Sequence, residues 1–403
     1  MHSSTLTTLV LISVVAVIVP ILVDIPKRVR VPAVVIELLF GILIGPAALS
    51  WASRGEIVDV LAEFGLAYLI FLAGFEINFA QLKGRPLKLA SATWVASLVL
   101  GLAGGFLLVQ TGLVRSTVIV GLALTTTALG TMLPILRDTD ELGTELGRHV
   151  LANGAVGEFA PVVAVAVVLG TDGPTRSLLT LVIFALLAAV AVLLAHRRPP
   201  DRWARLVEQT LTTSGQLPVR IALLAITALV WAAAGLGLDI LLGAFTAGIV
   251  FRTFCTTTHD QIHLHVIESK LDAVGFGFLI PLFFIVSGMK FDLHALLHDD
   301  GALAKLPIFL GLFLVTRGLP VMVIYRKELD DRTRRSVALL TSAGLPLIVV
   351  ITTIGVDTDR MRPANAAALV GAGMLSVLIF PMLGLGLSKL SDPVAEEPST
   401  SSA

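Results

Sequence analysis

The chain has 403 residues, of which 56% are hydrophobic and 14% are charged, and its mean hydropathy is +0.91. Typical soluble domains carry about 25% charged residues, so this composition excludes a soluble globular protein and predicts many membrane crossings. Acidic and basic residues are equal in number, which gives a formal net charge of zero, and no basic patch of the kind that binds nucleic acid is present. We therefore expect a lipid bilayer, and no nucleic acid, around this chain.

Apolar runs of about 17 to 25 residues, long enough to cross a bilayer as helices, recur along the chain. We predict an all-α membrane protein with about 13 transmembrane helices, at residues 6–24, 32–49, 57–76, 88–110, 116–136, 148–169, 177–195, 218–235, 237–252, 272–289, 304–325, 335–354 and 364–387. The first run lacks a basic region and a cleavage site, so we interpret it as a retained helix. Residues 1–390 then form one transmembrane domain, and residues 391–403 form a disordered tail.

Basic residues are distributed unequally among the predicted loops. Odd-numbered loops hold about twenty Lys and Arg, and even-numbered loops hold about seven. Because cytoplasmic loops carry the excess of basic residues, we expect a multi-pass protein with its N-terminus outside and its C-terminus in the cytoplasm, in the plasma membrane of a prokaryote. Cys255 is the single cysteine and cannot form an internal disulfide.

Short matches between the two halves of the chain, all in the same order, predict an inverted repeat around a site at the membrane midplane. The matches are Glu37 and Gly41 with Asp239 and Gly243, residues 73–78 with 287–292, and Thr127, Gly130 and Pro134 with Ser342, Gly344 and Pro346. Matched segments are seven apart in the predicted order, which gives the two halves opposite orientations. Chance similarity among apolar segments is the alternative.

The fifth and twelfth predicted segments contain residues that favour an interrupted helix. Proline removes a helical hydrogen bond and clashes with the preceding turn, and neighbouring Thr, Ser and Gly favour local unwinding. These residues are Gly130, Thr131 and Pro134 in the fifth segment and Ser342, Gly344 and Pro346 in the twelfth. We expect two discontinuous helices that cross at the midplane, where Thr126 and Thr127 offer hydroxyl oxygens to a small cation. Ordinary proline kinks are the alternative.

Glu158 lies in an apolar run, residues 151–169, that carries no other formal charge. An ionised side chain at the bilayer centre costs about 2.5 to 3.5 kcal/mol on insertion scales, so burial opposes the charged form and such a group can take up and release protons. We predict that Glu158 binds a proton or a cation. Asn153 is a further candidate ligand, but it lies five residues before Glu158, about one and a half turns, so the two side chains need not share a face. A protonated carboxyl that only packs helices together is the alternative.

Arg317 is the one basic residue deep in an apolar run, and a permanently charged guanidinium there requires a counter-charge. We predict either an ion pair with Glu158 or an approach to the negative ends of the interrupted helices. A purely structural lock is the alternative.

Glu37 and Asp239 are further acids in or beside apolar segments, and we interpret them mainly as residues of helix ends or interfaces. Neither histidine-containing loop holds a complete ligand set, so we predict no metal site and no cofactor. No nucleophile and base occur together within the apolar segments, which argues against an enzyme.

Several stretches of the chain, in order, match a known family pattern: VIELLFGILIGP (35–46), YLIFLAGFEINFAQLKG (68–84), LLGAFTAGIVF (241–251), IPLFFIVSGMKFDL (280–293) and ALLTSAGLPLIVVITTIG (338–355). With these motifs the chain resembles the second cation:proton antiporter family of the sodium/hydrogen exchanger superfamily, over nearly its whole length. The resemblance implies exchange of a monovalent cation, Na⁺ or K⁺, for H⁺.

The resemblance also implies a division of labour among the helices. It implies a homodimer with a dimerisation panel (about 6–76 and 218–289), an ion-carrying core (about 88–169 and 304–387) that moves against the panel, and a linker helix (about 177–195). The ion-binding acid of the family falls on Glu158, its Asn, Gln or Asp partner on Gly157, and its basic residue on Arg317.

Two features depart from the family pattern: Gly157 lacks a side chain, and Thr352 and Thr353 stand where an acid is expected. No nucleotide-binding domain follows the membrane segments, so gating of that kind is not expected. We predict a secondary antiporter in which a proton and a cation compete for Glu158, most simply one for one. The alternatives are a Na⁺-coupled organic-anion carrier of related fold and a non-transporting sensor or a channel.

Overall fold

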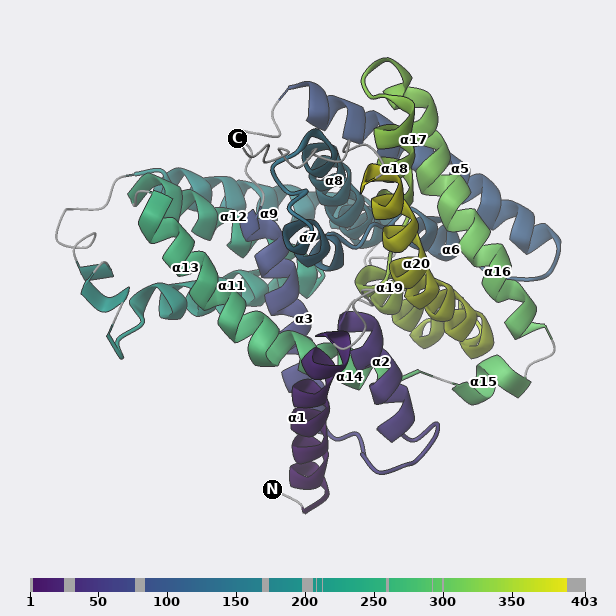
Figure 1. Cartoon of the computed structure of the whole chain (residues 1–403), viewed down its shortest axis with the longest axis horizontal. Helices are drawn as coiled ribbons and strands as arrows, with labels where there is room; N and C mark the ends of the chain where they lie inside the picture. Colours follow the sequence, from purple (N-terminus) through teal and green to yellow (C-terminus); the bar gives the residue numbers. More distant parts are fainter. Residues whose placement is uncertain are drawn as a thin grey trace, which may run out of the picture.

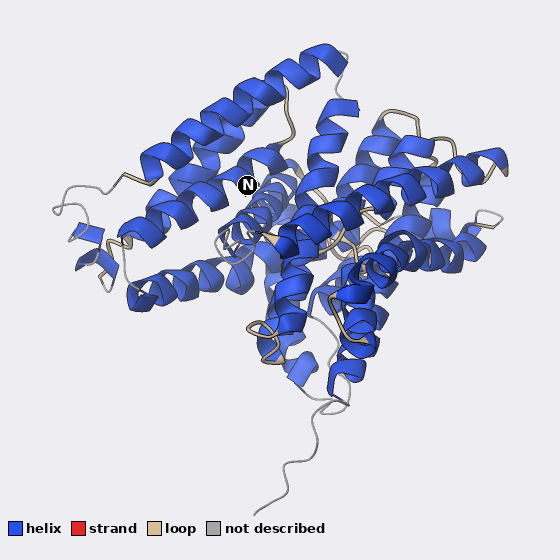
Figure 2. Ribbon diagram, turned by 90° about the horizontal axis from the view of Figure 1, so that it is seen from above, coloured by secondary structure: helices blue, strands red, loops and turns tan. Residues whose placement is uncertain are grey.

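The computed structural model describes residues 3–24, 33–76, 84–168, 174–197, 206–207, 209–211, 213–258, 261–291, 293–298 and 301–389. In this part of the chain all regular structure is helical (Figure 2), which confirms the predicted all-α class. Nine described helical stretches are long and apolar enough to cross a membrane, and three shorter apolar ones accompany them. The tail predicted at 391–403 lies outside the described residues.

The helices follow the predicted order. In the first half they are α1 (Ser3–Asp24), α2 (Ala33–Ile44), α3 (Glu56–Glu76), α5 (Arg85–Gln110), α6 (Thr117–Leu124), α7 (Leu129–Asp138), α8 (Glu145–Val168) and α9 (Pro174–Ala195). In the second half they are α11 (Leu217–Gly235), α12 (Ile240–Thr258), α13 (Gln261–Val274), α14 (Ile280–Met289), α15 (Leu293–His298), α16 (Ala302–Phe313), α17 (Leu319–Ile324), α18 (Asp331–Thr341), α19 (Pro346–Asp357) and α20 (Pro363–Lys389). Every predicted range overlaps one helix or one consecutive pair.

Two helices are continued through a π-helical turn. Residues Gly275–Leu279 join α13 to α14, and residues Leu314–Gly318 join α16 to α17. The range predicted at 272–289 therefore starts too late, because the helix begins at Gln261. Its first part, α13, is amphipathic: Ile267 and Leu271 are buried, whereas other positions carry charges, so a criterion based on continuous apolar sequence does not detect it.

The helices pack in two groups with α7 at their boundary. α3 packs against α12 and α14, and α2 against α14, whereas α5 packs against α6 and α8, and α20 against α16, α18 and α19. Figure 1 shows α11, α12 and α13 at one end of the longest axis, α5 and α16 at the other, and α7 and α8 between them. α7 packs against α8 and also against α3, so it contacts both groups.

Glycines bring two pairs of helices into backbone contact, and these contacts follow the predicted inverted repeat. Gly41 of α2 meets Gly288 of α14, and Gly248 of α12 meets Gly74 of α3; a Cβ at any of these positions would overlap the backbone of the facing helix. The second predicted segment (α2) thus contacts the tenth (α14) in the same way as the ninth (α12) contacts the third (α3). The equivalent of Gly41 is therefore Gly248, and the match with Gly243 was wrong, since Gly243 packs against α11.

Candidate functional site

Both expected helix interruptions are present. α6 ends at Leu124 and α7 begins at Leu129, while α18 ends at Thr341 and α19 begins at Pro346. Residues 125–128 and 342–345 therefore form two non-helical stretches of equal length.

The residues that we expected to cause the interruptions differ in their positions. Ser342 and Gly344 lie within the second break, and Pro346 is the first residue of α19. For the first break the expected position was several residues too late, because Gly130, Thr131 and Pro134 all lie inside α7.

Hydrogen bonds from the first stretch to the second stretch, to α8 and to the end of α18 explain where the first helix stops. The Ala128 N–H donates to the Ala343 carbonyl (2.9 Å), and the Thr127 N–H donates to the Gly157 carbonyl (3.0 Å). The Thr127 hydroxyl donates to the Thr341 carbonyl (2.6 Å). These contacts satisfy backbone groups that would otherwise have to continue the helix, since a buried polar group without a partner is costly. The crossing thus rests on backbone contacts between distant segments.

Glu158, on α8, lies beside this crossing with 1% of its surface exposed. Its Oε2 accepts a hydrogen bond from the Leu129 N–H at 3.1 Å, and the Gly130 amide also interacts with the carboxylate. These amides begin α7, where the helix dipole places partial positive charge. The helix end favours the ionised carboxylate, whereas burial favours the neutral one.

Arg317 is fully buried at the π-helical turn between α16 and α17. It donates to Thr127 Oγ1 (2.9 Å), Asn153 O (3.1 Å), Thr341 O (3.4 Å) and Ser97 Oγ (3.4 Å). Thr341 ends α18, so the guanidinium faces the negative end of an interrupted helix, the second of the two predicted arrangements. Among the described residues its hydrogen-bond partners are hydroxyls and carbonyls, and Glu158 is not one of them.

Gly157 makes room for this arginine. A Cβ at Gly157 would lie 2.6 Å from Arg317 Nη2 and 2.8 Å from Thr127 Oγ1, closer than non-bonded atoms normally approach. The guanidinium therefore occupies the space that a side chain before the acid would need. The missing side chain was visible in the sequence, but the group that takes its place was not.

The threonine hydroxyls at and near the first break all donate to backbone carbonyls. The hydroxyls of Thr126 and Thr131 donate to the carbonyls of Ala123 (2.9 Å) and Ala128 (3.0 Å), and Thr127 is held as described above. Each hydroxyl that donates in this way keeps lone-pair capacity as an acceptor. Thr126 and Thr127 lie in the first break, within the crossing.

The side-chain amide of Asn153 is directed elsewhere. Its Nδ2 donates to the His149 carbonyl (2.9 Å) and to the Tyr325 hydroxyl (2.8 Å), and its backbone carbonyl oxygen accepts from Arg317. Its side-chain oxygen, Oδ1, is buried and has no hydrogen-bond partner among the described residues, so the expectation that it binds the cation stays a prediction. Asn153 stands five residues before Glu158, and side chains at that separation point in different directions around a helix.

Glu37 and Asp239 lie at helices that do not form the crossing. Glu37 is buried on α2, which packs mainly against α14. Asp239 precedes α12 and its Oδ1 accepts from the Leu241 N–H (2.9 Å), as a residue at a helix start does. Asp239 also lines, with Val162 of α8, a narrow apolar pocket without room for a water molecule.

Ser97 and Tyr325 are polar residues of the site that the sequence did not indicate. Each is a single hydrogen-bonding side chain in an apolar segment, a property shared with many residues that only bond to their own helix. Ser97 accepts from Arg317, and Tyr325 accepts from Asn153. In each pair the two residues are far apart in the sequence.

This chain belongs to the sodium/hydrogen exchanger family, because the family model described as "Sodium/hydrogen exchanger, transmembrane" matches residues 13–385. It is similar to the putative Na⁺/H⁺ antiporter YjbQ of Bacillus subtilis (strain 168), with 26% identity over 98% of this chain and 65% of YjbQ. It is 27% identical to the Na⁺/H⁺-K⁺ antiporter GerN of Bacillus cereus, over 66% of this chain and 67% of GerN. Cation/H⁺ antiporter 19 of Arabidopsis thaliana is 29% identical over 81% of this chain and 47% of its own length.

The chain thus spans about half to two thirds of the length of these relatives. Among solved structures, the sodium proton antiporter MjNhaP1 from Methanocaldococcus jannaschii has the same fold. It matches with a TM-score of 0.69 and 17% identity, over 96% of this chain and 97% of MjNhaP1.

Proposed function

We propose that this protein is a secondary antiporter that exchanges a monovalent cation, Na⁺ or K⁺, for H⁺ by alternating access. The observation that carries the proposal is the buried carboxylate of Glu158 at the amino end of α7, beside two crossed helix breaks, in a chain of the sodium/hydrogen exchanger family. The names of its relatives, antiporters of Na⁺, K⁺ and H⁺, support this cargo.

Competition for one carboxylate provides the coupling. When Glu158 is ionised, Oε2 accepts from Leu129 and Oε1 is the oxygen offered to a cation. Hydroxyl oxygens of Thr126 and Thr127 and carbonyls of residues 125–128 supply further ligands of the type that hard cations prefer. When Glu158 is protonated, its negative charge is gone and the cation is released. Each protonation state therefore carries one cargo, and the two fluxes are linked without ATP.

An exchange of one cation for one proton follows from the surroundings of Arg317. Neutral oxygens hold its guanidinium, and an arginine remains protonated at any working pH. Its charge is constant, and Glu158 is the group that changes charge at the crossing. The exchange should then move no net charge, and a potential imposed across the membrane should leave its rate unchanged.

We propose that the moving core consists of α5 to α8 and α16 to α20, and that α1 to α3 and α11 to α14 form the panel, with α9 as linker. The separate packing of α2, α3, α12 and α14 on one side and of α5, α6, α8, α18 and α20 on the other supports this division. The panel would pair two copies in a homodimer. The excess of basic residues in odd-numbered loops supports an external N-terminus and a cytoplasmic C-terminus. We place the protein in the plasma membrane of a prokaryote, as two of its relatives named above are from Bacillus.

The test uses proteoliposomes that contain a pH-sensitive dye quenched by an imposed proton gradient. Adding Na⁺ or K⁺ to vesicles with the wild type should restore the fluorescence, and the ion that acts identifies the cargo. Glu158→Gln should abolish the response, whereas Glu37→Gln, which neutralises another buried acid, should keep it. A wild type that responds to neither cation would contradict the proposal, and a responding Glu158→Gln variant would contradict the assigned site.

A further inference from the structure

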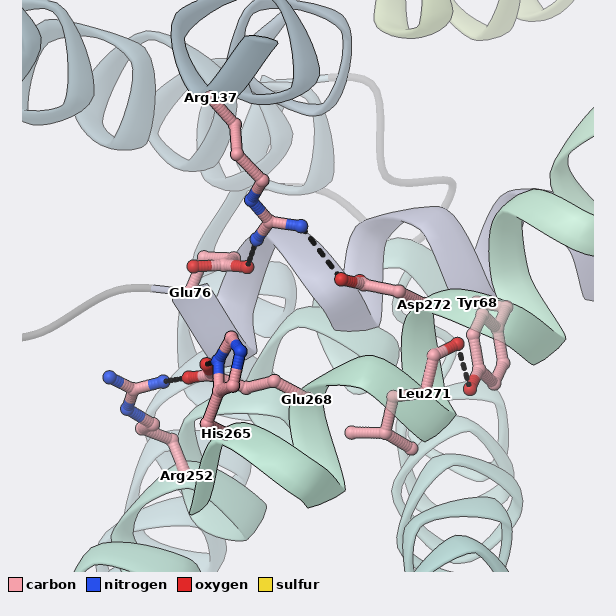
Figure 3. A network of polar contacts seen from close by, with 8 residues as sticks. All are labelled: Tyr68, Glu76, Arg137, Arg252, His265, Glu268, Leu271 and Asp272. Carbon is pink, nitrogen blue, oxygen red and sulfur yellow. Dashed lines mark hydrogen bonds and ion pairs between the residues drawn. The ribbon is translucent and has the colours of Figure 1, made fainter. Parts of the chain in front are cut away.

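Ionic side chains gather at the carboxyl end of α7 (Figure 3). Arg137, in the last turn of α7, donates from Nη2 to Glu76 Oε1 (2.6 Å) and from Nη1 to Asp272 Oδ2 (2.7 Å). Glu76 is the last residue of α3, and Asp272 lies on α13. One guanidinium therefore joins α7 to two other helices, and the close-up shows it reaching from α7 toward both carboxylates.

A second set of contacts lies beside it and joins other helices. Arg252 of α12 donates to Glu268 of α13 (2.6 Å), and His265 Nδ1 lies 3.7 Å from the same carboxylate. The Tyr68 hydroxyl of α3 donates to the Leu271 carbonyl (3.0 Å). These contacts connect α3, α12 and α13 with one another, all within the proposed panel. The contacts of Arg137 differ because α7 belongs to the proposed core.

α7 connects this cluster with the ion site. Its first residue, Leu129, donates to Glu158, and Arg137 lies close to its last residue. The helix has 10 residues and is therefore about 15 Å long. A short continuous helix moves as one body, so whatever holds its carboxyl end also restrains the amides that contact Glu158.

We propose that the Arg137–Glu76 and Arg137–Asp272 contacts form a latch between core and panel, and that Arg137 is a positioning residue whose latch must open in each transport cycle. The proposal rests on the proposed antiport function, since only a core that moves against the panel would separate these partners. We refer to the two contacts as the α7 latch.

The exposure of the latch suits repeated opening. The Arg137 side chain is 40% exposed, and those of Glu76 and Asp272 are 14% and 25% exposed. Partly solvated ion pairs are weak, whereas separating a fully buried pair leaves uncompensated charges in an apolar medium at a large cost. The positive charge of Arg137 also lies at the negative end of α7, so the arginine remains in a favourable field when its partners leave.

Reversible cross-linking tests the latch directly. In a Cys255→Ala background, cysteines replace Glu76 and Arg137 in one variant and Arg252 and Glu268 in a matched control within the panel. A short, reducible thiol cross-linker should lower cation-driven exchange by the 76/137 variant at least about ten-fold, and reductant should restore it. The cross-linked 252/268 variant should keep its exchange within about two-fold. Restored exchange after reduction also shows that the first variant is folded.

Full cross-linking of the 76/137 variant without loss of exchange would overturn the latch. The wild type is assayed in the same vesicle preparation: if it does not exchange, the proposed function fails, and if it does, only the latch fails.

Neutralising variants provide a second measurement without cysteines. Glu76→Gln and Asp272→Asn should each change the exchange rate by about three- to ten-fold, the size expected when one weak pair is lost. Glu268→Gln, which breaks a neighbouring contact inside the panel, should change it by less than about two-fold. Equal effects of all three variants would refute a special role for Arg137.

Discussion

The two broken helices share their geometry and differ in their chemistry. Both are interrupted over stretches of equal length, and the stretches bond to each other through Ala128 and Ala343. α7, however, starts with Leu129, whose N–H is donated to Glu158, whereas α19 starts with Pro346, which has no N–H to donate. The inverted repeat therefore duplicates the crossing of the backbone but equips only one helix start to hold a carboxylate.

The second broken helix contributes its other end. The carbonyl of Thr341, which ends α18, receives Arg317 and the Thr127 hydroxyl. The carboxylate of Glu158 thus faces the positive end of α7, and the guanidinium of Arg317 faces the negative end of α18. Both placements are favourable in the field of the helix dipoles. Two charges can therefore be buried close together without forming an ion pair with each other.

The largest effect is expected at the carboxylate itself. Glu158→Gln should reduce cation-driven exchange to the level of empty vesicles, because the side chain can neither ionise nor release a proton. Glu158→Asp should keep measurable exchange with an altered cation KM, since the carboxylate remains and only its reach changes. The measurement is the initial rate of dye recovery in proteoliposomes, and an inactive Asp variant with an unchanged melting temperature would contradict simple competition for the carboxylate.

The next largest effect concerns the end of α18. Arg317→Ala should destabilise the protein by about 3 kcal/mol, because it leaves a void and removes hydrogen bonds from a charged donor. Arg317→Lys should cost less, since it keeps the charge but loses donors. Thermal unfolding of the purified protein in detergent measures both. Equal melting of the Ala variant and the wild type would show that the guanidinium does not hold the crossing together.

Gly157, the residue before Glu158, allows a sharper test of how Arg317 is held. Gly157→Asn should cost about 2 kcal/mol, because the new side chain competes with Arg317 for one volume. In an Arg317→Lys background the same substitution should cost less, and a double-mutant cycle on unfolding free energies isolates this coupling. Strict additivity of the two changes would mean that the glycine is not required by the arginine.

Making α7 begin like α19 tests the difference between the two helix starts. Leu129→Pro should raise the cation KM by about ten-fold, because the ionised Glu158 loses a hydrogen-bond donor. Proline is tolerated at the first position of a helix. Leu129→Ala is the control that loses the same packing but keeps the N–H. If both variants shift KM equally, packing and not the amide is responsible.

The smallest expected effect concerns the N-terminal caps of α6 and α18, the helices that precede the two breaks. Ser116 caps α6 by accepting from the Ile119 N–H (3.3 Å), and Asp330 caps α18 by accepting from the N–H groups of Arg332 and Thr333 (2.9 and 3.2 Å). Replacing either cap with Ala should cost about 1 kcal/mol at pH 7.

Only the aspartate cap should depend on pH. Hydrogen bonds from the Thr333 side chain and amide lower the pKa of Asp330 below its ordinary value. Its contribution is therefore complete above the unfolded pKa of about 3.9 and disappears as the pH falls through the lower folded value. Melting curves at pH 7 and about pH 3 should show the Asp330→Ala deficit shrinking and the Ser116→Ala deficit unchanged. A constant Asp330→Ala deficit would contradict this assignment.

The sequence was sufficient to predict that Glu158 and Arg317 are buried charged residues, because a charge in an apolar run is detectable without knowledge of its neighbours. It was also sufficient to predict two interrupted helices. The position of the first interruption was not predictable from local residues, since it depends on acceptors at Gly157 and Ala343 rather than on Pro134.

The remaining differences have the same origin. The side-chain amide of Asn153 donates to Tyr325, a partner 172 positions away that the sequence did not indicate. The contacts of Arg137 join residues 61 and 135 positions apart, and its position near the end of an apolar segment resembles that of any boundary arginine. A single sequence does not show which distant segments contact each other.

The backbone contacts at Gly41, Gly74, Gly248 and Gly288 have a consequence for how this chain tolerates random change. At each of these positions even one methyl group would force two helices apart, so a library of single substitutions should return almost only glycine there. Exposed apolar positions outside these contacts, such as Leu224, which is 67% exposed, should accept most apolar residues. Mutational tolerance should therefore trace the glycine contacts of the helices as a pattern of intolerant sites, independent of any transport assay.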